Sequence, residues 1–297
     1  MSATRLAVQP RAAAPLREEA SARGSSTAVA PRVRRLAPAR VTLVGVINSE
    51  WIKLRSVRSA VLSLLAAAGA VIALGLLLSG VRSGGIGNEQ IGLQTGAGDD
   101  PVTTSLGGVD LGQLITGVLG VILVTAEYST GTIRSTLAAV PRRFPVLAGK
   151  AVVFGAATMV AMLFATFAAF LGGQAIMGST GASLGDPGVP RAVIAAAVYL
   201  TGVGLLGLAA GAILRGTASA IGALFAVMYA VPALFPLLPH SWNNTIGPYL
   251  PSNAGMAFMS LTHTAGTLAP LAGLGVFVGY ILAMVAAAAI LLKHRDA

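Results

Sequence analysis

The sequence predicts an all-α membrane protein that crosses the bilayer six times. Hydrophobic residues make up 55% of the 297 residues, charged residues only 10%, and the mean hydropathy is +0.80. Because a soluble surface ordinarily takes about 25% charged residues, these charges cannot cover a soluble globule. Uncharged stretches agree: the 77 residues between Arg215 and Lys293 contain no Asp, Glu, Lys or Arg, and about 20 apolar residues cross a bilayer as a helix.

Residues 1–40 are expected to form a disordered, basic cytoplasmic tail. They are rich in Ala, Arg, Pro and Ser and show no hydrophobic periodicity. Such a segment cannot bury enough apolar surface to offset the entropy lost on ordering. A tail that tethers the protein to the membrane surface is the alternative.

Residues 41–59 are expected to form an amphipathic helix on the membrane surface. Apolar residues recur there at three- and four-residue spacing: Leu43, Val44, Ile47, Trp51, Leu54 and Val57. Polar residues, Glu50 among them, fall between them. A tryptophan beside basic residues is typical of a helix on an anionic leaflet. The expected interfacial anchors are Trp51, Lys53, Arg55 and Arg58. A cytosolic extension of the first span is the alternative.

Residues 60–297 are expected to form a six-helix transmembrane domain. The uncharged stretches place its spans at about 60–79, 106–126, 144–176, 192–214, 218–238 and 268–292. The third stretch is longer than a bilayer requires, so this helix is expected to tilt or protrude.

The basic residues predict the orientation. With the N-terminus inside, 18 of the 20 Lys and Arg lie on the inner side, and only Arg82 and Arg191 lie outside. Because Lys and Arg concentrate in cytoplasmic loops, both termini are predicted to be cytoplasmic in a multi-pass protein of the cell membrane.

The composition also disfavours several classes of chemistry. The middles of the predicted spans contain no ionisable residue, which disfavours proton or sodium coupling. Gly149–Lys150 lacks the Ser or Thr that ends a Walker A motif, so the chain is not expected to be an enzyme that hydrolyses ATP. There is no cysteine and no H-E-x-x-H, so neither a metal site nor a cofactor is expected. The bases lie in the tail and loops rather than on a face with stacking aromatics, so nucleic acid is not an expected partner.

The loop at residues 127–144 carries the most information about function. It begins with an acid where the second span leaves the bilayer, and it contains a glycine turn, a short apolar helical pattern, Pro141 and two arginines. A short positive loop of this kind either anchors the topology or provides a docking surface for a soluble partner.

This loop resembles the inner-loop signature of the ABC type-2 permease family. The resemblance rests on E-Y-S-T-G-T-I-R-S-T-L at 127–137, followed by P-R-R and Lys150; S-E-W-I-K-L-R-S-V-R-S at 49–59 resembles the actinobacterial branch. It covers about residues 41–297. It implies a six-helix bundle like that of type V exporters, in which the inner loop forms a coupling helix that contacts a separate ATPase subunit. It also implies that two permease copies pair, as a homodimer or a heterodimer.

Carried over residue by residue, the resemblance implies these ATPase-coupling positions: Glu127, Tyr128, Gly131, Thr132, Arg134, Leu137, Arg142 and Arg143. The expected function is the permease subunit of an ATP-dependent exporter. The Ala-, Gly-, Leu- and Val-rich spans suit a hydrophobic or amphipathic substrate. The alternative is a membrane anchor or sensor that transports nothing and recruits a soluble cytoplasmic partner.

Overall fold

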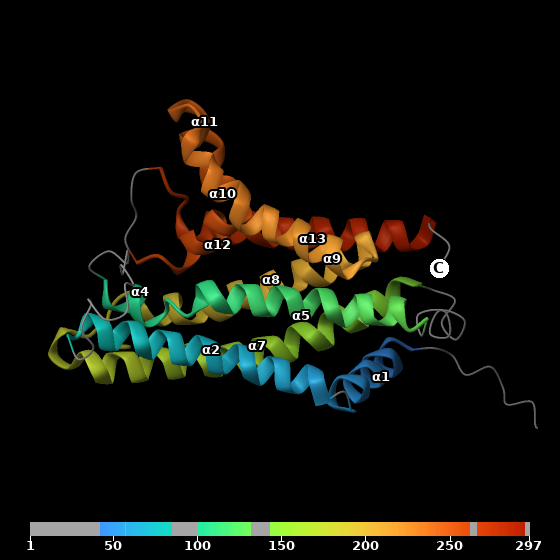
Figure 1. Ribbon diagram of the computed structural model, residues 1–297, viewed down its shortest axis with the longest axis horizontal. Helices are drawn as coiled ribbons and strands as arrows, with labels where there is room; N and C mark the ends of the chain where they lie inside the picture. The colour runs from blue at the N-terminus through green and yellow to red at the C-terminus, as the bar shows by residue number, and fades with distance from the viewer. Residues whose placement is uncertain (1–41, 57, 85–99, 132–142, 262–265, 295–297) are drawn as a thin grey trace, which may run out of the picture. The chain divides into compact units, whose positions relative to one another are not determined.

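The computed structural model describes residues 42–56, 58–84, 100–131, 143–261 and 266–294. Within these ranges every regular element is helical and no strand occurs (Figure 1). Six helices there are long and apolar enough to cross a membrane. The fold class and the number of spans predicted from the sequence are therefore confirmed.

The spans are two simple helices, one long helix, a central helix, a broken helix and a final helix. In chain order they are α2 (Arg58–Arg82), α5 (Val109–Ser129), α7 (Arg143–Met177), α8 (Val189–Leu214), the broken helix of α9 (Thr217–Phe225), η2 (Ala226–Ala230), α10 (Val231–Leu234) and η3 (Phe235–Leu237), and α13 (Pro270–His294).

Shorter helices lie outside the spans. They are α1 (Leu43–Ser56), α4 (Pro101–Ser105), η1 (Gly178–Thr180), α11 (His240–Ile246), η4 (Gly247–Tyr249) and α12 (Pro251–Met259). The stretch before the last span, rich in Pro and Gly, thus contains helical segments of its own.

The second span begins later than the sequence predicts. Leu106 lies in the link between α4 and α5, and the long helix starts at Val109. The intervening Gly108 lies against α2 so closely that a Cβ there would overlap the carbonyl group of Val71. The break thus coincides with a close tertiary contact, which hydropathy does not record.

Helix α8 is the centre of the bundle. It packs against α5, α7, α9, α12 and α13, and most of its residues are buried. Its closest neighbour is α5: a Cβ at Gly207 would overlap the carbonyl oxygen of Gly117, and one at Gly120 would overlap that of Gly204. These glycines let the two backbones approach as small residues do in membrane bundles.

The two ends of the bundle differ in what they contain. At one end, which we call the α1 end, Leu64, Leu147 and Leu292 share one apolar cluster, so the start of α2, the start of α7 and the end of α13 lie together near α1 (Figure 1). At the other end, the α12 end, Arg191 of α8 donates hydrogen bonds to the carbonyl oxygens of Phe258 and Ser260.

Candidate functional site

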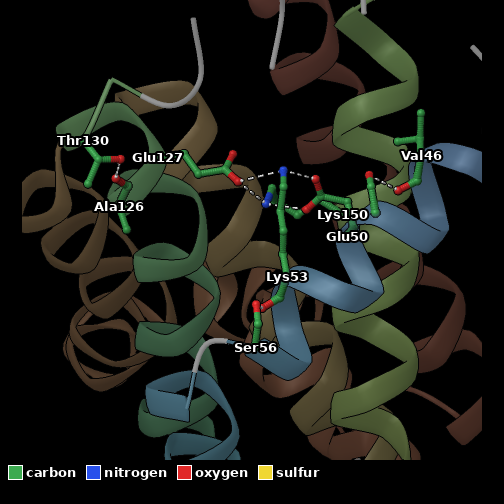
Figure 2. A network of polar contacts seen from close by, with 9 residues as sticks. Val46, Glu50, Lys53, Ser56, Ala126, Glu127, Thr130 and Lys150 are labelled. Atoms are coloured by element: carbon green, nitrogen blue, oxygen red, sulfur yellow. Dashed lines mark hydrogen bonds and ion pairs between the residues drawn. The ribbon is translucent and has the colours of Figure 1, made fainter. Parts of the chain in front are cut away.

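Four charged side chains from three helices meet at the α1 end. Glu50 and Lys53 come from α1, Glu127 from the last turns of α5, and Lys150 from the start of α7 (Figure 2). We call these four residues the ion cluster. Its two acids and two bases balance, so the cluster has no net charge.

Lys150 donates hydrogen bonds to both acids of the ion cluster. Its Nζ donates to Glu50 Oε2 at 2.7 Å and to Glu127 Oε1 at 2.8 Å. Lys53 Nζ lies 2.6 Å from Glu50 Oε1 and 3.6 Å from Glu127 Oε1. The side chains of Glu50 and Lys150 are 4% and 7% exposed, whereas that of Lys53 is 43% exposed. Two buried members thus form the inner part of the cluster, and Lys53 forms its outer edge.

The spacing of residues along α1 explains why Glu50 points inward. Val46, Glu50 and Leu54 recur every fourth position and are the buried residues of this helix. Helix α1 lies close to α7, since a Cβ at Gly149 would lie 2.8 Å from Val46 Cγ1. The sequence places Glu50 among the polar residues of α1 that face away from its apolar side. In the structure, Glu50 is instead packed against the bundle.

The same register leaves large apolar side chains of α1 exposed. They are Leu43, Val44, Trp51 and Ile52. Arg55 and Arg58 are also exposed. Their role as interfacial anchors, with Trp51, stays a prediction, whereas Lys53 has the additional partners described above.

Each charge in the ion cluster favours the charged form of its partners. Burial alone would raise the pKa of Glu50, but the charges and hydrogen bonds of Lys150 and Lys53 outweigh it and hold this pKa below its ordinary value. Burial likewise would lower the pKa of Lys53, but Glu50 and Glu127 raise it overall. Glu50 and Lys53 therefore remain charged over a wide range of pH.

The ion cluster lies at the base of the segment that joins α5 to α7. Glu127 precedes that segment and Lys150 follows it, so their hydrogen bond joins its two flanks. Between them, Gly131 has a φ of +71° with open space around its Cβ position. This backbone conformation suits glycine and strains other residues, which agrees with the glycine turn expected there.

A second contact holds the end of α5. The guanidinium group of Arg215 lies over the ring of Tyr128, 5.4 Å from its centroid, within the range of a cation–π interaction. Arg215 sits between α8 and α9 in the left-handed conformation, with a φ of +58°. The turn between these helices is thereby connected to the same end of α5.

The structure places the other predicted coupling residues less completely. Arg143 is the first residue of α7, and its side chain is outside the description. The remaining four positions lie outside the described residues: Thr132, Arg134, Leu137 and Arg142. Their contact with an ATPase stays a prediction.

The sequence analysis missed the partnership of Glu50 with Lys150. These residues are 100 positions apart, so no local pattern pairs them. The four-residue spacing of Val46, Glu50 and Leu54 places these residues on one face of α1, but the spacing alone does not show that this face points inward.

Beside the ion cluster lies a cavity of about 690 Å³ between α1, the start of α2, α5 and α7. Its walls include the cluster and apolar side chains such as Leu119, Ile122 and Phe154. Within the described ranges, no three His, Asp, Glu or Cys side chains gather as they would around a metal ion.

Comparison with known families identifies a match over most of the spans. A family model described as ABC-2 family transporter protein matches residues 46–235. The matched region contains the whole ion cluster and reaches into the broken fifth span, whereas α11, α12 and α13 lie beyond it. No curated protein matches the chain.

Proposed function

Because the chain belongs to the ABC-2 transporter family and is a membrane permease of an ABC transporter, we propose that it is the transmembrane subunit of an exporter driven by a separate ATPase. The ATPase docks at the α1 end, on the loop at residues 127–144. The observation that carries this proposal is the ion cluster, which ties both flanks of that loop to α1.

The ion cluster gives a route by which force on the loop reaches the spans. A push on the loop acts on α5 and α7 together, because the hydrogen bond of Glu127 to Lys150 joins them. Helix α1 moves with them through Glu50. Since α5 packs on α8 through glycines, the movement passes to the central helix. A bundle with two arrangements is then biased by the nucleotide state of the ATPase.

The charges at the two ends support a cytoplasmic α1 end. They also support a protein of the cell membrane with both termini on the cytoplasmic side. Among the described residues, Lys53, Lys150, Arg215 and Lys293 lie at that end. Arg82 and Arg191 lie toward the α12 end. Basic residues favour the cytoplasmic side, which is also where ATP is available.

A second permease copy is part of the proposal. The fifth span and α13 are little buried: only 11% of the most apolar 18-residue stretch of each is buried in the protein. They expose large apolar side chains, among them Phe225 and Leu282. Surfaces of this kind suit contact with lipid, with a partner copy and with a hydrophobic or amphipathic substrate.

Photocrosslinking in native membranes tests the docking site. A photoreactive amino acid at exposed Ser129, at the α1 end, should crosslink to a protein that mass spectrometry identifies by its nucleotide-binding motifs. The matched control is exposed Ser183, which lies at the other end of α7, near the start of α8. A crosslink from Ser129 to a soluble protein without such motifs would instead support the anchor or sensor function.

Purification tests the division of labour between the subunits. The permease alone should hydrolyse no ATP in lipid nanodiscs. Hydrolysis should appear when the ATPase that was identified by crosslinking is added. Turnover of ATP by the isolated chain, free of contaminating enzyme, would contradict the proposal.

A further inference from the structure

The cavity beside the ion cluster has one polar side and one apolar side. Its polar lining consists of the ion cluster with Ser56, Ser59, Ser63 and Thr130. Its apolar lining comes mainly from α5 and α7, with Leu119, Ile122, Leu123, Val153 and Phe154. A cavity of about 690 Å³ with this division suits an amphipathic molecule, and its size is within the usual range for a small-molecule site.

The position of the cavity indicates where its occupant comes from. Ile122 lies seven residues before the end of α5 at Ser129, which is about 10 Å along a helix. The side chain of Ile122 is 44% exposed on a membrane-spanning helix. The cavity therefore runs from the α1 end to the depth at which lipid chains lie.

The charges near the cavity favour an anionic group. The ion cluster is neutral, and both of its carboxylates already accept hydrogen bonds from lysines. Lys53 is its exposed member, and Arg55 and Arg58 are exposed on the same short stretch of chain. Within the described chain, the hydroxyl groups of Ser59 and Ser63 make no hydrogen bond, so both can donate to a ligand.

We propose that this cavity binds one anionic phospholipid from the surrounding leaflet. The phosphate lies at Lys53 and the serines of the first turns of α2, and an acyl chain lies along Leu119 and Ile122. The bound lipid fills the space between α1 and α5, so it forms part of the contact that holds α1 to the bundle. This site does not depend on the ATPase.

A single-tryptophan reporter tests the site in the full chain. The protein has two tryptophans, Trp51 and Trp242, which are replaced by Phe. Ile122→Trp then places the reporter on the cavity wall. Leu65→Trp is the matched control, because Leu65 lies seven residues from the start of α2 and is 61% exposed, yet does not line the cavity.

Quenching by brominated lipids in nanodiscs gives the readout. At Ile122→Trp, brominated phosphatidylglycerol should bind at least about fivefold more strongly than brominated phosphatidylcholine, which corresponds to about one basic side chain. At Leu65→Trp the two lipids should quench alike. Lys53→Gln should lower the preference at Ile122→Trp, whereas Lys293→Gln, at the end of α13, should leave it unchanged.

Three results would contradict the proposal. Equal quenching by the two lipids at Ile122→Trp would mean that the cavity holds bulk lipid without selection. Absence of quenching by either lipid would mean that lipid does not enter the cavity. A preference that survives Lys53→Gln in full would also contradict the proposed contact.

Discussion

Lys150 is the buried base that joins the three helices of the ion cluster. It is 7% exposed, and its ammonium group bonds carboxylates from two other helices. When one partner of such a buried group is removed, the charges left behind lose their compensation. This loss costs more than the intact pair contributes.

Lys150→Met should therefore lower the free energy of unfolding by about 3–5 kcal/mol, because Glu50 and Glu127 are left with Lys53 alone. Equilibrium unfolding in detergent measures the change. Lys293→Met is the control, since Lys293 is an exposed lysine at the end of α13. Equal stability of the two variants would show that the ion cluster does not hold the helices together.

The pKa shifts predict how stability depends on pH. The pKa of Glu50 is lowered below 4.5 in the folded chain, so its contribution is present above that value and is lost as the pH falls through the lower folded value. The pKa of Lys53 is raised above 10.5, so its contribution is present below 10.5 and is lost as the pH rises past the folded value.

Thermal unfolding of the wild type should accordingly lose stability as the pH falls below about 4.5. Glu50→Gln, which has no carboxylate to protonate, should be less stable at neutral pH and lose less on acidification. The melting temperatures of both proteins between acid and neutral pH test this. Parallel acid limbs for the two proteins would show that Glu50 is not the group that titrates.

Among the helices, the contact of α5 with α8 leaves the least room for change. A Cβ at Gly207 would overlap backbone atoms of α5, whereas at Gly279 of α13 nothing in the described chain lies within 4 Å of the Cβ position. Both residues are in the interiors of membrane-spanning helices. They form a matched pair for substitution by alanine.

Gly207→Ala should destabilise the protein by about 1–3 kcal/mol, because the backbones of α5 and α8 must separate to admit a methyl group. Gly279→Ala should be neutral or slightly stabilising, since alanine is the better helix former. Unfolding in detergent compares the two. A Gly207→Ala protein as stable as Gly279→Ala would mean that α5 and α8 are not in close contact.

The glycine turn after α5 gives a prediction about coupling. Gly131→Val should strain the turn by about 1–3 kcal/mol, because valine rarely adopts a positive φ. Membrane insertion should be kept while copurification of the ATPase falls. Gly222→Val is the control, since Gly222 has open space around its Cβ position and lies within helix α9, where its φ is not positive. Equal copurification with both variants would show that the turn does not aim the docking loop.

Hydropathy predicts the six spans because the thickness of the bilayer sets the length of a spanning helix. The interruptions are not predictable in this way. The break at Gly108 lies where α2 approaches closely through Val71. The fifth span contains a π-helical turn, η2, just before Pro232, and a hydropathy average takes no account of backbone hydrogen bonding.

The candidate site was predictable only in part for the same physical reason. Glu127 and Lys150 stand out in the sequence because each is a charge next to a long apolar stretch. The hydrogen bond from Lys150 to Glu50 is a tertiary contact over 100 positions. The inward direction of Glu50 follows from how α1 packs on α7, which the sequence of α1 alone does not determine.

At the scale of the whole molecule, we propose that the α1 end is the side on which ATP is hydrolysed. The ion cluster, the described flanks of the proposed docking loop and the proposed lipid site all lie at that end. The α12 end, with Arg191 bound to α12, is then the outer side. Every step of the proposed coupling requires this orientation.

Cysteine labelling in intact cells and in inverted membrane vesicles tests that orientation most directly. The chain contains no cysteine, so Ser129→Cys at the α1 end and Ser183→Cys at the α12 end each give a signal without background. With a membrane-impermeant thiol reagent, Ser183→Cys should react in intact cells, and Ser129→Cys should react only in inverted vesicles. Reaction of Ser129→Cys in intact cells would place the ion cluster outside and contradict the account.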